Sequence, residues 1–333
     1  MRDRFSDIFK EPPTPRRTNW LRLLLGIFYK VVIFALGIFP LLLMGVLLLV
    51  PVMFFLVQSI DPYRPPRVPH AERVGHAHGL VIDPADGALY VASIRGLYWI
   101  KNPEWAERVT DSYQDSRGII ALGPGEFLAG GRPDIRDRVS GFAPPYSGLI
   151  RSQDAGKKWR DVSLSGEAEF HTLEVKGGAI FAWDNVSLGF MVSREGGKTW
   201  ETRSHLDQVV DFAVNPADAN QVYATAEGDF LASRDGGRSW QALSTRRLPQ
   251  IAWPDAGHLW GVDEEGGVYL SQDAGASWQR QGVLAGPAEA FLAAPSGLYA
   301  AAYDDAAGVV IYTSADGGQS WQELYRDPPL SVD

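Results

Sequence analysis

Two histidines, His76 and His78, stand two residues apart at the start of an apolar run, a spacing that could hold a metal ion. Residues two apart on a β-strand share a face, so we expect both imidazoles to point the same way. Imidazole nitrogens joined by a further His or Glu are ligands that divalent transition metals accept. Histidines that serve only as hydrogen-bonding residues also fit this spacing, and we favour this interpretation over metal binding. The sequence therefore predicts no metal and no cofactor.

One eight-residue phrase, S-x-[DE]-x-G-x-x-W, occurs five times between residues 152 and 321. Its four defined positions are Ser152, Asp154, Gly156 and Trp159; Ser193, Glu195, Gly197 and Trp200; Ser233, Asp235, Gly237 and Trp240; Ser271, Asp273, Gly275 and Trp278; and Ser314, Asp316, Gly318 and Trp321. The serine hydroxyl and the acidic group can bond backbone N–H groups of a turn, glycine can take a positive φ, and tryptophan can pack the turn against a sheet. The phrase therefore predicts a recurring structural turn.

The spacing of these phrases indicates the architecture. Successive tryptophans of the phrase are 41, 40, 38 and 43 residues apart, which matches one four-stranded propeller blade per repeat. Residues 79–105 show the same order of apolar runs and turns without the phrase, and end at Trp105. Counting that segment predicts an all-β, six-bladed β-propeller over residues 73–326, followed by a C-terminal tail at 327–333.

The phrase resembles the Asp-box, or BNR repeat, of sialidases, Vps10-type receptors and photosystem II assembly factors. The resemblance implies that each copy lies in the turn between the third and fourth strands of a blade, on the face away from known active sites. One copy has Glu195 where aspartate is usual, so the resemblance does not predict the hydrogen bonds of that turn. The His-x-His-Gly start, followed by Asp-Pro and an aromatic strand, also resembles bacterial propellers labelled glycosylhydrolases, over residues 74–326.

Aligning the inner strands of the blades collects polar residues near His76 and His78 at one end of the central channel. These residues are Arg117, His171, Gln208 and Glu289. A sialidase would need an arginine cluster, a tyrosine nucleophile with a glutamate partner and an aspartate acid/base, and its F-R-I-P motif is absent from the chain. We therefore interpret the acidic Glu174, Asp211 and Glu289 of the inner strands as channel-lining groups, and predict no catalytic residue.

Blade two carries an insertion. The 54 residues from Trp105 to Trp159 exceed the repeat by about a dozen, and the excess is residues 131–146, between the second and third strands. That connection emerges on the face opposite the Asp-box turns, where propellers usually bind, and arginines and aromatics are enriched at interfaces. A solvated, tolerated loop is the alternative. The partner contacts expected from the insertion are Arg132, Arg136, Arg138, Phe142 and Tyr146.

The N-terminal region predicts a membrane anchor. Residues 31–60 contain no charge and are mostly Leu, Val, Phe and Ile, which exceeds the roughly 20 residues that span a bilayer. This run is too long for a signal peptide and ends in no cleavage site, which favours an uncleaved signal anchor. Residues 1–30 hold seven basic and three acidic residues, which predicts a cytoplasmic N-terminus, with residues 19–30 either interfacial or part of the span. A Pro-rich linker, 61–72, then leads to a periplasmic propeller on a single-pass protein of a bacterial inner membrane.

Charge and composition narrow the function. The chain has a formal net charge of −9 and no cysteine, and residues 61–333 hold 24 basic and 37 acidic residues, so nucleic-acid binding is disfavoured. The anchor, the missing sialidase signature and the likeness to photosystem assembly propellers favour a non-enzymatic accessory, assembly or stabilising subunit of a membrane protein complex, photosynthetic or respiratory. Its lipid contact would be residues 31–60. The alternatives are a periplasmic glycan hydrolase of sialidase-like fold and a metal-binding propeller that uses His76 and His78.

Overall fold

The computed structural model describes residues 20–33, 72–226, 229–243, 246–304 and 308–329. The chain divides into two compact units, Met1–Val68 and Pro69–Asp333. The described part of the first unit is helix α1 (Trp20–Ile33), which runs without a break across the expected boundary at residue 30. Within the described ranges, no helix is both long and apolar enough to cross a membrane. The predicted membrane helix at 31–60 and the linker at 61–72 lie almost wholly outside these ranges, and both stay predictions.

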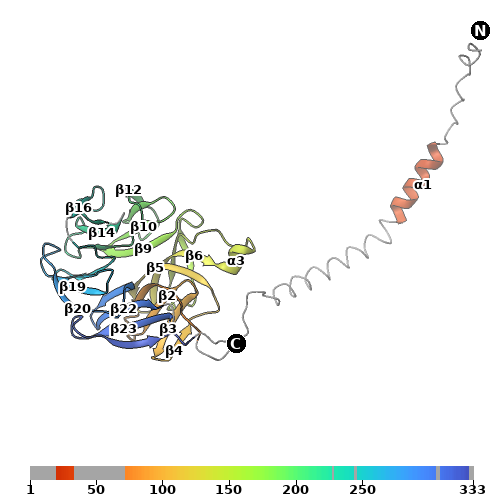
Figure 1. Ribbon diagram of the computed structural model, residues 1–333. Helices are drawn as coiled ribbons and strands as arrows, with labels where there is room; N and C mark the ends of the chain where they lie inside the picture. The colour runs from red at the N-terminus through yellow and green to blue at the C-terminus, as the bar shows by residue number, and fades with distance from the viewer. Residues whose placement is uncertain (1–19, 34–71, 227–228, 244–245, 305–307, 330–333) are drawn as a thin grey trace, which may run out of the picture. The chain divides into compact units, whose positions relative to one another are not determined.

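The second unit is a ring of six four-stranded antiparallel sheets, as Figure 1 shows, and this confirms the all-β, six-bladed propeller. Each blade uses four strands that are consecutive in the chain. The first strand of each blade packs against the first strands of its neighbours and lies innermost. The blades are, in order, β1 (Ala77–Ile82), β2 (Leu89–Ser93), β3 (Gly96–Asn102) and β4 (Trp105–Arg108); β5 (Gln114–Gly123), β6 (Glu126–Asp134), β7 (Leu149–Ser152) and β8 (Arg160–Ser163); β9 (Phe170–Lys176), β10 (Ala179–Asp184), β11 (Gly189–Ser193) and β12 (Glu201–His205); β13 (Asp211–Val214), β14 (Val222–Ala226), β15 (Asp229–Ser233) and β16 (Gln241–Leu243); β17 (Gln250–Asp255), β18 (His258–Val262), β19 (Gly267–Ser271) and β20 (Gln279–Val283); and β21 (Ala288–Ala294), β22 (Gly297–Asp304), β23 (Gly308–Ser314) and β24 (Gln322–Arg326).

The loops of the propeller fall into two sets because neighbouring strands run in opposite directions. The turns from first to second strand and from third to fourth strand share one face, named the bottom face. The turns from second to third strand share the other face, named the top face, with the connections between blades. The blade-two insertion lies on the top face between β6 and β7 and contains the short helix α3 (Ile135–Val139). Its predicted first residues, 131–134, belong to strand β6, so the connection itself begins at residue 135.

The hydrophobic core lies between the blades. Side chains of a strand alternate between the two faces of its sheet, so each blade packs apolar residues against both neighbours. Between blades four and five, Tyr223 and Phe230 meet Ile251 and Trp253, and all four are buried. The Tyr223 and Trp253 rings stack with their centroids 5.6 Å apart. Burial of one large apolar side chain contributes about 1.5–3 kcal/mol, so packing between blades is the main stabilisation of the ring.

The five repeated phrases form the turns between the third and fourth strands of blades two to six, and these are named the box turns. In the turn after β7, Ser152 Oγ donates to Asp154 Oδ1 (2.9 Å) and accepts from the Gly156 N–H (2.9 Å). Gly156 has a φ of +82°, a left-handed conformation that glycine adopts without strain. The hydrogen bond from the glycine N–H to the serine Oγ recurs at 2.7–2.9 Å in all five turns. The serine and glycine positions therefore build the turn itself.

The box turns also pack on the preceding blade. Trp240 Nε1 donates to Ser204 Oγ at 2.9 Å, and the indole lies edge-on to Phe190 with the ring centroids 5.2 Å apart. A Cβ atom at Gly237 would lie 2.2 Å from the Phe190 ring, so a side chain at this position would force the two blades apart. The box turns therefore join neighbouring blades.

The turn with Glu195 makes fewer hydrogen bonds than its counterparts. The Glu195 carboxylate accepts from Thr199 Oγ1 (2.9 Å), and the described structure shows no backbone N–H of its own turn bonded to it. The Asp235 carboxylate accepts from the N–H groups of Arg238 (3.0 Å) and Ser239 (2.9 Å) and from the Ser239 hydroxyl (2.6 Å). The extra methylene of glutamate moves its carboxylate away from the turn backbone.

We expect Glu195→Asp to stabilise the propeller by about 1 kcal/mol, since a net intramolecular hydrogen bond contributes about 0.5–1.5 kcal/mol. Urea unfolding would measure the change in the free energy of unfolding. The reverse substitution, Asp235→Glu, is the matched control and should lower that free energy by a similar amount. Equal stability of Glu195→Asp and the wild type would contradict this account of the turn.

Blades one and six close the ring without sharing a strand, and side chains of β3 and β23 belong to the same hydrophobic cluster. Blade one has no box turn. Instead, the buried Asp327 carboxylate accepts hydrogen bonds from the N–H groups of Val74 (2.7 Å) and Gly75 (3.0 Å) at the start of blade one. It also accepts from the Val309 N–H (3.2 Å) and the Tyr325 hydroxyl (2.9 Å) of blade six. Asp327 therefore belongs to the propeller, although the sequence placed it in the C-terminal tail.

Candidate functional site

The six innermost strands surround a central channel that contains a cavity of about 590 Å³. His76 and Gln208, which the sequence placed at the channel opening, do not line this cavity. The polar residues that line it include His78, Arg117, His171, Glu174, Asp211 and Glu289. The structure thus brings most of the expected channel residues together on a shared cavity.

The two histidines of the His-x-His pair point to different blades, which differs from the expectation that they share a face. His76 precedes β1, stacks on Tyr303 of blade six with centroids 3.9 Å apart, and has its Nδ1 2.5 Å from Glu289 Oε1. His78 Nδ1 instead lies 3.1 Å from Asp115 Oδ1 of blade two. A β-bulge between Ala77 and Gly79 interrupts the strand alternation on which the expectation rested. Within the described residues, no group of three or more His, Cys, Asp or Glu side chains is placed to hold a metal ion.

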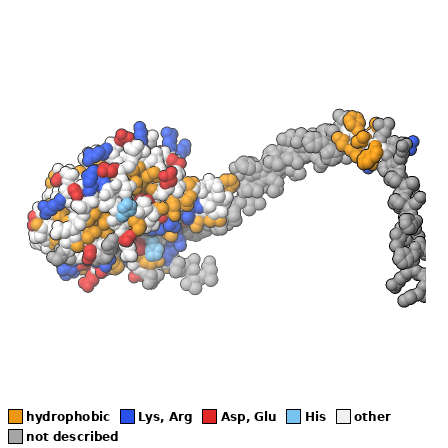
Figure 2. Space-filling view, turned by 90° about the horizontal axis from the view of Figure 1, so that it is seen from above, with side chains coloured by type: hydrophobic (Ala, Val, Ile, Leu, Met, Phe, Trp, Pro, Cys, Tyr) orange, Lys and Arg blue, Asp and Glu red, His pale blue; other side chains and the backbone are white. Residues whose placement is uncertain are grey.

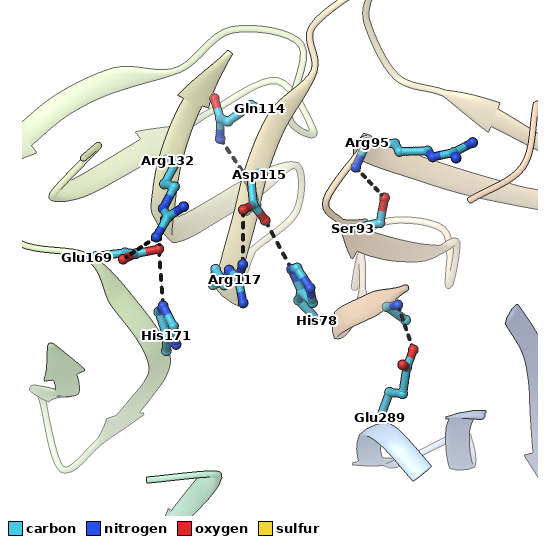
Figure 3. A network of polar contacts seen from close by, with 12 residues as sticks. His78, Ser93, Arg95, Gln114, Asp115, Arg117, Arg132, Glu169, His171 and Glu289 are labelled. Atoms are coloured by element: carbon cyan, nitrogen blue, oxygen red, sulfur yellow. Dashed lines mark hydrogen bonds and ion pairs between the residues drawn. The ribbon is translucent and has the colours of Figure 1, made fainter. Parts of the chain in front are cut away.

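Asp115 of β5 joins two of the channel residues, as Figure 3 shows. Its Oδ1 lies 3.1 Å from His78 Nδ1 and its Oδ2 lies 3.2 Å from Arg117 Nη2. Burial would raise the pKa of Asp115, but hydrogen bonds and positive charge from His78 and Arg117 outweigh burial and lower it. The carboxylate is therefore ionised at neutral pH and does not serve as a proton donor.

Glu169 makes a second network of the same type at the start of blade three (Figure 3). Arg132 donates to both of its oxygens, from Nε (2.7 Å) and from Nη2 (3.2 Å), and His171 Nε2 lies 3.1 Å away. The Glu169 side chain is 1% exposed. Burial would raise the pKa of Glu169, but the hydrogen bonds from His171, Arg132 and Asn185 lower it to about 2. Glu169 was not predicted from the sequence, where its only signal is an acidic residue immediately before an inner strand.

We expect Glu169→Gln to cost up to about 3 kcal/mol of unfolding free energy at pH 7, because the pKa is lowered from 4.5 to about 2 in the folded state. This contribution is fully present above about pH 4.5 and is lost as the pH falls toward 2. Urea unfolding at pH 7, 5 and 3 should therefore show a difference from the wild type that shrinks on acidification. A difference that stays constant with pH would overturn this assignment.

Two carboxyl groups farther along the channel wall have pKa values shifted in the opposite direction. Burial in the channel raises the pKa of Glu174 to about 7. Burial raises the pKa of Asp211 to about 8. A hydrogen bond from the Ile251 N–H opposes this increase, and the negative charge of Glu174 adds to it. The protonation of both groups therefore changes near neutral pH. Sequence reasoning named both as channel-lining groups but missed this protonation, because it depends on the distance between neighbouring blades.

The insertion is fixed to the propeller by its own arginines. Arg132 bonds Glu169, and Arg136 donates to both oxygens of Asp134, from Nε (3.0 Å) and Nη2 (2.6 Å). Asp134 also caps α3 by accepting from the Arg136 N–H. Two of the arginines expected to contact a partner are thus engaged in intramolecular ion pairs. Phe142 in the same insertion is 83% exposed.

A chain of contacts links the insertion to the first described residue of the propeller unit. Glu72 Oε2 lies 3.1 Å from Arg108 Nε. The Arg108 guanidinium lies 3.9 Å from the centre of the Tyr113 ring, and the Arg136 guanidinium of the insertion lies 5.0 Å from the same ring. Glu72 therefore lies beside the base of the insertion.

Exposed apolar side chains concentrate in the top-face loops of blades one to four. Val139 is 65% exposed at the end of α3, close in sequence to Phe142. Figure 2 shows charges of both signs interspersed over the visible face of the propeller, with no large patch of one sign. The exposed apolar side chains of the top-face loops are Ile94, Ile135, Val139, Phe142, Val186 and Val210.

Comparison with known proteins identifies the fold. No family model and no curated protein matches the chain. A GH74 enzyme from Niastella koreensis matches with 16% identity and a TM-score of 0.53, covering 76% of this chain and 46% of that one. The gluconolactonase XC5397 from Xanthomonas campestris matches with 14% identity and a TM-score of 0.52, covering 77% and 88%. YCF48 bound to D1 peptide matches with 16% identity and a TM-score of 0.47, covering 76% and 83%. The similarity to the first two structures identifies a β-propeller and leaves the activity to be argued from the site.

Proposed function

We propose that this chain is a membrane-anchored, non-enzymatic propeller that docks through its top face onto a membrane protein complex, as an accessory or assembly subunit. The observation that carries this proposal is the group of exposed apolar side chains in the top-face loops, above all Val139 and Phe142. The insertion that bears them is rigidly fixed by Arg132 and Arg136, so little conformational entropy is lost when it docks.

The ionisation of the carboxyl groups at the channel opening supports a binding role for that opening over a catalytic one. Asp115 and Glu169 are both held ionised by histidine and arginine partners, so neither is suited to donate a proton to a leaving group. Their ion pairs join β5 to blade one and β6 to blade three. These networks position the strands of the top face.

The membrane anchor completes the proposal. The uncharged residues 31–60 would form a single span in a bacterial inner membrane, with residues 1–30 in the cytoplasm and the propeller in the periplasm. Glu72, the last residue of the Pro-rich linker and the only one within the described ranges, contacts Arg108 beside the base of the insertion. The top face would then be held close to the membrane, where an integral membrane complex presents its surface.

The test uses the full-length chain purified from membranes in a mild detergent. Val139→Asp/Phe142→Asp should reduce the yield of the co-purifying membrane complex at least ~10-fold, because charges replace exposed apolar anchors at the interface. Leu122→Asp is the matched control, since Leu122 is an exposed apolar residue near the end of β5, on the bottom face. Equal loss in both variants, or a complex that stays intact in the double variant, would contradict the docking model.

A second candidate function, a periplasmic glycan hydrolase of sialidase-like fold, rests on the raised pKa values of Glu174 and Asp211. Carboxyl groups that titrate near neutral pH are suited to general acid–base work in a cavity. This function requires turnover of a glycan by the purified chain and its loss in Asp211→Asn with the fold intact. Turnover that persists in Asp211→Asn would exclude this pair as the catalytic groups.

A further inference from the structure

The Glu174 and Asp211 carboxyl groups come from neighbouring blades, on β9 and β13, and line the same cavity. Lys176, on the same strand as Glu174, is the nearby cation. Its Nζ lies 3.7 Å from Glu174 Oε2, beyond hydrogen-bond distance, and donates instead to the backbone oxygen of Trp253 at 2.8 Å. Glu174 Oε2 is sealed from bulk solvent and accepts no hydrogen bond. An acceptor oxygen that has the Lys176 ion pair but no hydrogen bond therefore lies in the wall of the channel.

The charges around this pair do not balance. Asp211 accepts hydrogen bonds from the Ile251 N–H (3.0 Å) and the Phe212 N–H (2.9 Å), and these donors carry no net charge. Lys176 offsets one of the two carboxylates, so one negative charge remains when both are ionised. The other charged or titratable residues that line the cavity are His78, Asp83, Arg117, His171 and Glu289. Arg117, His171 and Glu289 each have carboxylate or histidine partners of their own. The Glu174–Asp211 pair can therefore balance one more positive charge than the protein supplies. At neutral pH a proton bound to the pair provides that charge.

We propose that the channel binds a small organic cation, with an ammonium or guanidinium group placed between Glu174 and Asp211. The cavity of about 590 Å³ is in the range of small-molecule sites, which are mostly apolar with a few polar groups. The partly exposed apolar residues that line it, and that would contact the alkyl part of such a ligand, are Ile82, Ile120, Val175, Phe291 and Leu292. This site is separate from the top-face docking surface and does not depend on the proposed function.

An organic cation fits this site better than a metal ion. A calcium ion takes six to eight oxygen ligands, and no third His, Cys, Asp or Glu of the described chain joins the pair to form a metal-binding group. A guanidinium group needs planar hydrogen-bond acceptors, and Glu174 Oε2, which accepts no hydrogen bond in the protein, supplies one. Binding would displace the proton that the pair holds, so it would be coupled to proton release.

The test is calorimetric titration of the full-length chain in detergent with methylguanidinium, n-butylammonium and calcium chloride as separate probes, from pH 6 to pH 9. The organic cations should bind with an affinity that rises up to about 10-fold per pH unit below pH 8 and flattens above it, with proton release measured in buffers of different ionisation enthalpy. Asp211→Asn and Glu174→Gln should each abolish this pH dependence and weaken binding at least ~10-fold. Glu107→Gln, a change of an exposed glutamate on β4, should leave both unchanged.

The possible outcomes are distinct. Organic-cation binding that is independent of pH, or that survives in both channel variants, would overturn the proposed site. Tight calcium binding with no response to the organic cations would replace the proposal by a metal site. No binding of any probe to a folded chain would reject the inference. Because no membrane partner is present in the titration, failure of the docking model does not affect its result.

Discussion

Replacing Asp327 by alanine should lower the free energy of unfolding of the propeller by about 4 kcal/mol, since loss of one partner from a buried charged network costs about 3–5 kcal/mol. The carboxylate is fully buried and its oxygens accept hydrogen bonds from Val74, Gly75, Val309 and Tyr325. Its removal leaves these donors without an acceptor in a dry environment, and each such group carries a desolvation cost.

The effect should be large because of where this carboxylate lies. Neighbouring blades elsewhere in the ring are joined by box turns, whereas blade one has none, and the described chain shares no strand between blades one and six. Asp327 links the start of the first blade to the end of the last, and Glu289 of blade six adds a second polar link through His76 and the Ala77 N–H. The loss of Asp327 should also speed opening of the ring, which hydrogen exchange at Val74 and Gly75 would detect.

Urea unfolding of Asp327→Ala against the wild type measures the prediction. Tyr325→Phe is the matched control, because it removes one hydrogen bond to the same carboxylate (2.9 Å) and should cost about 1 kcal/mol. A loss of less than 1 kcal/mol in Asp327→Ala would mean that the other contacts between blades one and six, which include the hydrogen bonds to Glu289, are enough to close the ring.

Asp211→Asn should stabilise the propeller above pH 8, which is the opposite of what most substitutions at buried polar groups do. The folded state raises the pKa of Asp211 from 3.8 to about 8 through burial, opposed by a backbone hydrogen bond and reinforced by the charge of Glu174. The unfolded chain releases this proton near pH 4, and the folded chain keeps it until about pH 8. The wild type therefore loses stability as the pH rises between these values.

The amide of asparagine has no charge to bury, so the variant escapes this loss. We expect a gain of roughly 2–4 kcal/mol at pH 9, reduced by about 1 kcal/mol for a weakened backbone hydrogen bond. At pH 4 and below the gain should vanish, and the variant should be slightly less stable than the wild type. Urea unfolding at pH 4, 7 and 9 measures this trend, with Glu107→Gln as an exposed control that should show no such slope. A difference that does not grow with pH would mean that Asp211 is ionised in the channel.

The sequence by itself determined the architecture of this protein. Five phrases at a period near 40 residues predict one four-stranded blade each, because a repeat of that length can form only one supersecondary unit. The serine and glycine of each repeat form the turn through hydrogen bonds and backbone angles within the repeat itself. The box turns can therefore be predicted from residues that are close together in the chain. The position of the blade-two insertion between the second and third strands followed from the same period, and the structure confirms that position.

The tertiary structure decided how the residues of the site are paired. His76 and His78 are two residues apart, yet a bulge turns one toward Glu289 and the other toward Asp115. Strand periodicity cannot anticipate a bulge, because the extra residue is fitted to neighbouring strands and not to the local sequence. Only the closed ring places Asp327 against Val74, 253 residues away in the chain.

The ionisation of the channel was decided in the same way. Asp115, Glu169, Glu174 and Asp211 are acidic residues on or beside inner strands, and composition treats them alike. In the ring, the pKa values of the first two are lowered by His78 and Arg132 from neighbouring blades together with Arg117 and His171 two residues along the chain, while burial raises the pKa values of the other two. The sequence determines which groups are present, and their protonation depends on distances across blades, because burial and Coulomb interactions are set by the folded structure.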